Sequence, residues 1–122
     1  MVAYNFMKQF ADDVASGRKD FTIRGQRKRH ARPGEPVQLY TGMRTKCCHK
    51  LVDPDPICLS VRPIVIKSDL IMINGKELSR ATENLIIVLD GFKTRDDFFQ
   101  FHLNGSEEVH KWLIRWSFFN DR

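Results

Sequence analysis

The octapeptide GRKDFTIR, residues 17–24, constrains the fold most, because its glycine permits a sharp turn directly before a short alternating strand. Apolar and polar side chains alternate in residues 21–24, and alternation sends the two kinds to opposite faces of a strand. Thr22 and Arg24 therefore share a face, and the turn can bring the amine of Lys19 over the hydroxyl. The stretch predicts either a functional cleft in which these three groups converge or an ordinary edge strand with solvated basic residues.

The length and composition are typical of one globular domain, which we expect to span residues 1–122. Hydrophobic residues make up 42% of the chain and charged residues 29%, which argues against the disordered and membrane-spanning classes. No apolar run approaches the length of a bilayer, and the N-terminus lacks the basic and apolar regions of a signal peptide. We therefore predict a cytoplasmic protein without a membrane partner.

The net charge of +5 is unevenly distributed along the chain. Residues 18–50, here called the basic segment, carry a net charge of +8, and the rest of the chain sums to −3. Basic charge confined in this way is typical of a polyanion-binding face, most simply for nucleic acid, although a solvated loop would have the same composition. The basic side chains of the segment are Arg18, Lys19, Arg24, Arg27, Lys28, Arg29, Arg32, Arg44, Lys46 and Lys50.

The first half of the chain is predicted to hold one helix among short strands. Phe6, Phe10 and Val14 lie on one helical stripe, and Gly17 follows where a helix end favours a left-handed residue. Residues 25–36 are polar, basic and rich in proline, so they predict an exposed loop. The predicted elements are strands at 3–6, 21–24, 37–41 and 47–52 and a helix at 7–16.

The second half begins with a strand pattern at 57–66, in which Pro63 indicates a bulge or an edge position. Asn74-Gly75 is the strongest hairpin signal in the chain, and it lies between strands predicted at 70–73 and 76–78. Two helices should follow. Ser79 is expected to cap the first, at 81–89, which has Glu83 near its start, and Thr94 with Asp97 is expected to cap the second.

Phe98, Phe101 and His102 should share one face of that last helix, and residues 112–118 predict a closing strand. Helices inserted into a mainly β chain predict the α+β class. We expect a small mixed β-barrel of five to six strands with two to three helices. The aromatic residues expected in its core, rather than as base-stacking platforms, are Phe98, Phe99, Phe101, Trp112 and Trp116.

The three cysteines are too few and too irregularly placed for a disulfide framework. Cys47 and Cys48 would face opposite sides of a strand, so these two residues with His49 and Cys58 do not suit one zinc ion. We expect reduced, small apolar thiols in the barrel, no metal site and no cofactor. The histidines expected to be structural or solvated are His30, His49, His102 and His110.

Four short motifs lie in the first half of the chain: GRK at 17–19, TIR at 22–24, PGE at 33–35 and LYTG at 39–42. Together they resemble the ASCH domain family, whose fold is similar to the PUA barrel of RNA-modifying proteins. The run TGMRTKC at 41–47 further resembles small phage and bacterial members. DGF at 90–92 and the strand around Trp116 extend the resemblance over most of the chain. The resemblance implies a cleft that takes RNA or a modified nucleoside.

The helix, turn and strand up to Arg24 are similar to those of the small bacterial acetylcytidine amidohydrolases. This resemblance implies three catalytic residues: Lys19 as the activating lysine, Thr22 as the nucleophile and Asp90 in place of a glutamate. The other predicted site residues divide into two groups. Those expected to bind substrate are Arg18, Arg24 and Arg44, and those expected to bind nucleic acid are Arg27, Lys28, Arg29, Arg32 and Lys46.

The chemistry implied by the resemblance is physically reasonable. A threonine hydroxyl needs a base to become a nucleophile, and a lysine in a cationic, partly buried pocket can have its pKa lowered enough to serve. Asp90 could then position water or protonate the leaving amine, while Arg24 or backbone amides stabilise the oxyanion. Two alternatives remain open, a non-catalytic RNA-binding module that uses the same residues and, by family analogy only, a ribonuclease.

Overall fold

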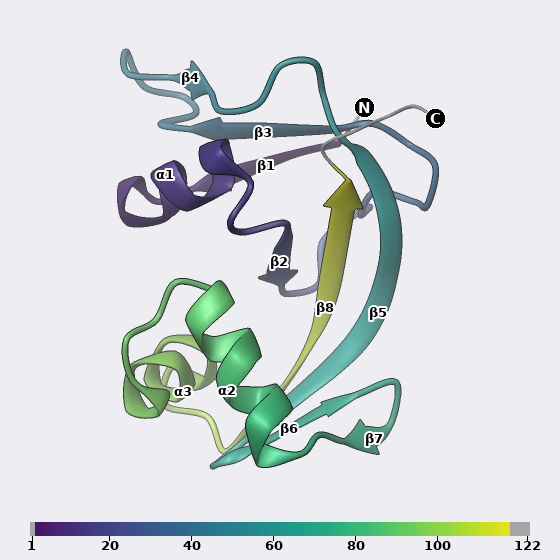
Figure 1. Cartoon of the computed structure of the whole chain (residues 1–122), viewed down its shortest axis with the longest axis vertical. Coiled ribbons are helices and arrows are strands. Elements are labelled where there is room, and N and C mark those ends of the chain that lie inside the picture. Colours follow the sequence, from purple (N-terminus) through teal and green to yellow (C-terminus); the bar gives the residue numbers. More distant parts are fainter. Residues whose placement is uncertain (1, 118–122) are drawn as a thin grey trace. The chain divides into compact units, whose positions relative to one another are not determined.

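The computed structural model describes residues 2–117, so the predicted strand residue Phe118 lies outside the described part of the chain. The described chain divides into two compact units that are interleaved in sequence. Unit 1 holds residues 2–21, 27–61 and 114–117, and unit 2 holds residues 22–26 and 62–113. The α+β class is confirmed (Figure 1), since helix α1 follows the first strand and helices α2 and α3 lie together between the last two strands of the described chain.

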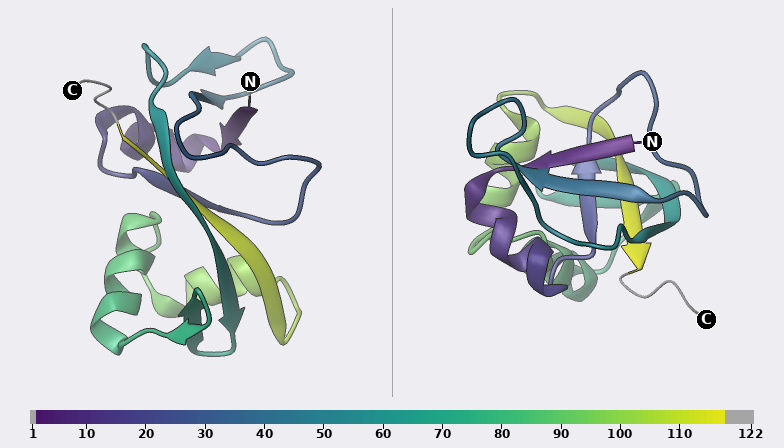
Figure 2. Two further views of the ribbon diagram at one scale, coloured as in Figure 1. Left: turned by 90° about the vertical axis from the view of Figure 1, so that its right-hand side faces the viewer. Right: turned by 90° about the horizontal axis from the view of Figure 1, so that it is seen from above.

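Unit 1 contains a three-stranded sheet in the order β1-β3-β4. β1 and β3 run parallel and side by side, with Val2 opposite Val37 and Phe6 opposite Thr41 (Figure 2, right). β4 pairs antiparallel with the end of β3. The bounds of these elements and of the helix that follows β1 are β1 Val2–Phe6, α1 Lys8–Ser16, β3 Val37–Thr41 and β4 His49–Lys50.

Helix α1 forms as its pattern predicts. Phe10 and Val14 are buried on one face, which packs on the sheet of unit 1, and Gly17 ends the helix with a φ of 90°. The N–H of Gly17 donates to the carbonyl of Val14, so the turn ahead of Lys19 is a left-handed helix end. Lys19, which follows this turn, is buried, so water does not surround its side chain as it would that of a surface lysine.

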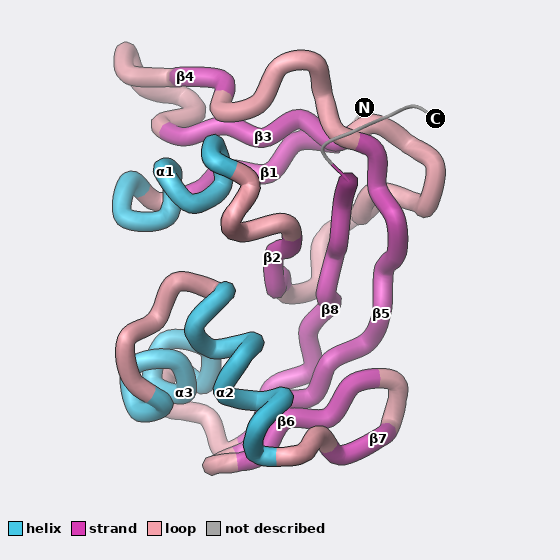
Figure 3. The backbone as a smooth tube through the Cα atoms, in the orientation of Figure 1, coloured by secondary structure: helices cyan, strands magenta, loops and turns pink. Residues whose placement is uncertain are grey.

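The second sheet has the order β2-β8-β5-β6-β7. Its hairpin between β6 and β7 is confirmed, because Ile73 pairs with Lys76 across Asn74 and Gly75. Both turn residues have positive φ, 53° and 78°, as a tight hairpin turn of the favoured hand requires. The bounds of these strands, magenta in Figure 3, are β2 Phe21–Arg24, β5 Ile57–Lys67, β6 Leu70–Ile73, β7 Lys76–Glu77 and β8 Glu108–Ser117.

Unit 2 also holds the helices α2 (Arg80–Leu89) and α3 (Arg95–Leu103). Both predicted caps are confirmed. The Ser79 hydroxyl accepts a hydrogen bond from the Thr82 N–H, and the Thr94 hydroxyl accepts one from the Asp97 N–H. None of the helices in the described residues is long or apolar enough to cross a membrane.

Several local predictions need correction. The strand expected at 47–52 contracts to His49–Lys50, because residues 42–48 form a tight turn around Gly42. Phe101 was expected in the core but is 46% exposed, since the buried face of α3 is formed by its neighbours Phe98 and Phe99. Cys58 is buried as expected, whereas Cys47 and Cys48 are exposed in the turn. The described strands number eight in two sheets, two of them only two residues long.

Candidate functional site

Thr22 is a buried hydroxyl held by an arginine. Strand β2 is covered on both faces, so Thr22 is only 4% exposed although it lies opposite the apolar residues of the strand. Arg24 lies two residues further on the same face, and its Nε donates a hydrogen bond to the Thr22 hydroxyl oxygen at 2.8 Å. A guanidinium in this place would stabilise negative charge that develops on that oxygen.

A second polar group of unit 2 joins Asp90, His102 and Lys111. Asp90 ends α2, and His102 lies in the last turn of α3. The His102 Nε2 lies 3.0 Å from a carboxylate oxygen of Asp90, and the His102 Nδ1 lies 3.1 Å from the Nζ of Lys111 on β8. These three residues are here called the relay.

The chemistry of the three groups fixes the direction of the hydrogen bonds. A lysine ammonium has only N–H donors, so Lys111 donates the hydrogen bond and the Nδ1 of His102 accepts it. The proton of the neutral ring then lies on Nε2 and is donated to the Asp90 carboxylate. The side chains of His102 and Asp90 are 2% and 4% exposed, whereas Lys111 reaches partly into solvent. Lys111 is therefore the accessible end of the relay.

The environment of Lys111 links the relay to the Thr22–Arg24 pair. Burial lowers the pKa of Lys111 from its ordinary value, the negative charge of Asp90 opposes this shift, and the positive charge of Arg24 adds to it. Arg24 and Lys111 lie on β2 and β8, which are hydrogen-bonded neighbours in the sheet. Unit 2 thus holds three of the predicted site residues, Thr22, Arg24 and Asp90, together with the half-buried amine of Lys111.

Sequence reasoning missed two members of this group. His102 was expected to be structural or solvated, and it is buried and hydrogen-bonded on both ring nitrogens. Lys111 was not considered at all. One signal existed for His102, its position four residues after the buried Phe98 on α3, which places a polar ring on the core face of a helix. Nothing local distinguishes Lys111 from other strand lysines, because its partners come from α2, α3 and β2.

Lys19 belongs to unit 1, whereas the other two predicted catalytic residues, Thr22 and Asp90, belong to unit 2. Lys19 is 3% exposed, and its backbone N–H donates to the carbonyl of Asp13 at 2.9 Å. Its ammonium nitrogen lies 5.4 Å from the ring centroid of Phe10 and 4.9 Å from that of Phe21, within the range of cation–π attraction.

The loop between β2 and β3, pink in Figure 3, is held by its own contacts. Arg27 donates to the carbonyl of Ala3 at 3.1 Å and lies over the ring of Tyr4. Arg29 forms an ion pair with Glu35, and the backbone N–H of Arg32 donates to the same carboxylate at 2.7 Å. That backbone bond is the main reason why the pKa of Glu35 lies below its ordinary value, with Arg29 adding to the shift.

The predicted nucleic-acid contacts of the basic segment differ in whether their side chains already make contacts within the protein. Arg27 and Arg29 make contacts within the loop, whereas the side chains of Lys28 and Arg32 are exposed without a contact of that kind in the described structure. Lys46, the remaining predicted nucleic-acid contact, is also exposed, as are Arg18 and Arg44, which are predicted to bind substrate.

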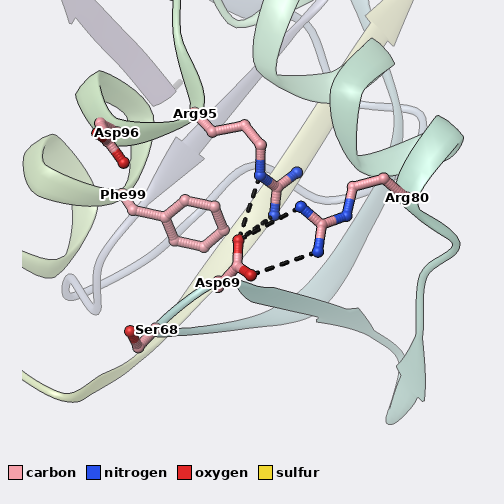
Figure 4. Close-up of a pocket in the computed structure, with 6 residues that line it drawn as sticks. All are labelled: Ser68, Asp69, Arg80, Arg95, Asp96 and Phe99. Atoms are coloured by element: carbon pink, nitrogen blue, oxygen red, sulfur yellow. Dashed lines mark hydrogen bonds and ion pairs between the residues drawn. The ribbon is translucent and has the colours of Figure 1, made fainter.

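A separate pocket of unit 2, with a volume of about 340 Å³, lies at the starts of α2 and α3 (Figure 4). Asp69 stands between Arg80 and Arg95, and its carboxylate lies 2.7 Å from an Arg95 nitrogen and 3.3 Å from an Arg80 nitrogen. The buried Glu83 also pairs with Arg95, at 3.1 Å, and accepts the N–H of Ile71. Both arginines of this pocket are paired with carboxylates. The pocket is therefore an ion-pair network that joins the two helices to β6.

Hydrogen bonds to Arg95 lower the pKa of Asp69, as expected for a carboxylate that is ionised in such a network.

Among the described residues, no three histidine, cysteine, aspartate or glutamate side chains are grouped to hold a metal ion. The chain matches no protein-family model, and no curated protein or solved structure is significantly similar to it.

Proposed function

We propose that the protein binds RNA or a modified nucleoside and hydrolyses the N-acyl amide of an acylated cytidine. The observation that carries the proposal is the buried Thr22 hydroxyl, which receives the Arg24 hydrogen bond at 2.8 Å and belongs to the same unit as the relay. A hydroxyl that serves only packing needs no cation against it. One that attacks a carbonyl needs a group that stabilises its developing charge.

The proposed roles follow from the resemblance and are supported by burial. Thr22 attacks the acyl carbon, and Lys19 takes the proton of its hydroxyl. Arg24 stabilises the negative oxygen, and Asp90 positions water or protonates the leaving nitrogen. All three predicted catalytic residues are at most 4% exposed. Buried polar side chains are rare unless they are paired or have a chemical role.

Two further expectations belong to this proposal. The chain would be an ASCH domain protein with a PUA-like barrel acting in the cytoplasm, and its parallel β1–β3 pair and five-stranded sheet would be parts of that barrel. An experimental structure of the whole chain tests the barrel directly.

A non-catalytic RNA-binding module is the second candidate. The exposed cations of the basic segment favour it, because Lys28, Arg32, Arg44 and Lys46 can reach phosphates without giving up an internal contact described here. This candidate needs no nucleophile and predicts no turnover.

The test compares Thr22→Val with Thr22→Ser. Valine keeps the branched shape and the strand preference but removes the attacking oxygen, whereas serine keeps the hydroxyl. With N-acetylcytidine as substrate, we expect Thr22→Val to lose about 10⁴-fold or more in kcat and Thr22→Ser to retain measurable turnover. Calorimetric affinity for acetylcytidine and for a structured RNA is measured in parallel. Full turnover by Thr22→Val would eliminate the covalent mechanism, and RNA binding without turnover by the wild type would favour the second candidate.

A further inference from the structure

The relay raises the question of which of its members can reach a ligand. The side chains of Asp90 and His102 are 4% and 2% exposed, and one Asp90 oxygen already accepts the His102 Nε2 proton at 3.0 Å. The oxygen that accepts this proton cannot reach a leaving group without giving up its hydrogen bond to His102. Lys111 is the member that is partly exposed, and its amine is held by the ring at 3.1 Å.

We propose that Lys111, rather than Asp90, is the acid that protonates the leaving nitrogen, and that His102 and Asp90 position its amine. This inference rests on the proposed function, because it names the proton donor of that same reaction. Asp90 and His102 then play the part of orienting groups: the carboxylate fixes the ring tautomer, and the ring fixes the amine.

The proton balance of the reaction closes with this assignment. In the first half, Lys19 takes the Thr22 proton and the Thr22 oxygen forms a bond to the acyl carbon. The C–N bond breaks, and its electron pair stays on nitrogen, which takes a proton from the Lys111 ammonium. In the second half, water attacks the acyl-Thr22 ester and gives a proton to Lys111. The Thr22 oxygen leaves the acyl carbon and recovers its proton from Lys19, so one amide and one water become one acid and one amine.

The charged groups around Lys111 suit an acid that must lose its proton in each cycle. Burial and the Arg24 charge from β2 lower the pKa of Lys111, which makes the ammonium a stronger acid, and the Asp90 charge limits the shift. On the side of α3, Lys111 faces His102. The His102 ring is neutral while its Nδ1 accepts a hydrogen bond, so it adds no positive charge. On β8 itself, the nearby Glu108 and His110 pair with each other.

The test is the pH profile of kcat/KM on N-acetylcytidine for wild type, Lys111→Met, Asp90→Asn and the control Lys67→Met. Lys67 is a partly exposed lysine of unit 2 that pairs with Glu108 at 3.6 Å. We expect the wild-type profile to fall at high pH as Lys111 deprotonates. Lys111→Met should lose that limb and about 10²–10⁴-fold in kcat, whereas Lys67→Met should keep both.

Asp90→Asn tests whether Asp90 acts through the charge it places near Lys111. If Asp90 had a purely structural role, the pH of the high-pH limb would not change. Asparagine keeps an oxygen to accept the His102 proton but removes the charge that raises the pKa of Lys111, so the limb should move to lower pH. Trace labelling of the wild-type amines with acetic anhydride gives a second measurement that needs no variant. In it, Lys111 should titrate below the ordinary pKa of a lysine.

The outcomes separate the two proposals. A Lys111→Met variant with wild-type turnover and an unchanged limb would overturn the role of Lys111 and leave the hydrolase intact. Titration of Lys111 at the ordinary pKa of a lysine would overturn it as well. If wild type does not hydrolyse acetylcytidine at all, the proposed function fails, and this inference fails with it.

Discussion

Gly42 is a position in unit 1 where a side chain would meet the backbone. Its φ is 67°, and a Cβ at this position would lie 2.6 Å from the carbonyl oxygen of Cys47. Thr45 closes the same turn, because its hydroxyl donates to the Gly42 carbonyl at 2.6 Å and accepts the Cys47 N–H at 3.0 Å. The atom in the way belongs to the backbone, so it cannot move aside as a flexible side chain would.

Gly42→Ala should therefore destabilise the protein by about 1–3 kcal/mol, the range for a backbone forced into an unfavourable conformation. The matched control is Gly34→Ala. Gly34 has a φ of 91° but no atom within 4 Å of a Cβ, so this variant isolates the cost of positive φ from the cost of the clash. Urea midpoints of both variants are compared with wild type. Equal losses would show that the clash with Cys47 contributes nothing.

Elements defined by local chemistry could be predicted from the sequence. The Asn74-Gly75 hairpin, the Ser79 and Thr94 caps and the helix end at Gly17 each depend on residues close together in the chain. The four residues of β2 were also predicted, but the burial of Thr22 was not, because alternation says which face a side chain takes and not what covers it.

The candidate site shows the same limit more strongly. Thr22 and Arg24 share a strand, so their proximity follows from the sequence. The relay does not, because Asp90, His102 and Lys111 come from three elements and meet only through tertiary packing. The exposure of Phe101 has the same cause, since which stripe of α3 is buried depends on what packs against it.

The loop between β2 and β3 is an element whose order depends on one carboxylate. Glu35 pairs with Arg29 and accepts the backbone N–H of Arg32, so it ties two of the loop's basic residues together. Because the pKa of Glu35 is lowered in the folded protein, its contribution to stability is present above its ordinary pKa. The contribution is lost as the pH falls through the lowered folded value.

Glu35→Gln removes the charge of this carboxylate at neutral pH, as protonation does in the wild type at low pH. The variant should therefore loosen the loop at neutral pH to the same extent as low pH loosens the wild-type loop. Glutamine still offers one acceptor oxygen but loses the charge that attracts Arg29. We expect faster hydrogen exchange at the Arg32 amide and faster tryptic cleavage within the loop. Glu77→Gln on the exposed β7 removes the same charge elsewhere and should change neither rate. Unchanged exchange at Arg32 in Glu35→Gln would show that the carboxylate does not order the loop.

At the scale of the whole molecule, the unequal distribution of charge is the feature that bears on a polyanionic partner. The basic segment carries +8 in a chain of net charge +5, so the rest of the chain is slightly acidic. Binding of RNA to such a protein releases condensed counterions, and its affinity falls steeply as salt rises. The structure divides the loop cations into two with internal contacts, Arg27 and Arg29, and two with exposed side chains, Lys28 and Arg32.

Replacement of all four loop residues by alanine should flatten the plot of log affinity against log salt, and the two pairs should contribute unequally. For a single-stranded RNA, each lost phosphate contact lowers the slope by about 0.7, so the Lys28→Ala/Arg32→Ala double variant should lose about 1.4. The Arg27→Ala/Arg29→Ala variant should lose less slope, because these guanidinium groups are already engaged with Ala3 and Glu35. The control Lys76→Ala/Lys93→Ala removes two exposed charges from unit 2 and lowers the net charge equally. If the control flattens the slope as much as Lys28→Ala/Arg32→Ala, net charge rather than the loop governs binding, and an unchanged slope in all variants rejects a phosphate-binding role for the loop.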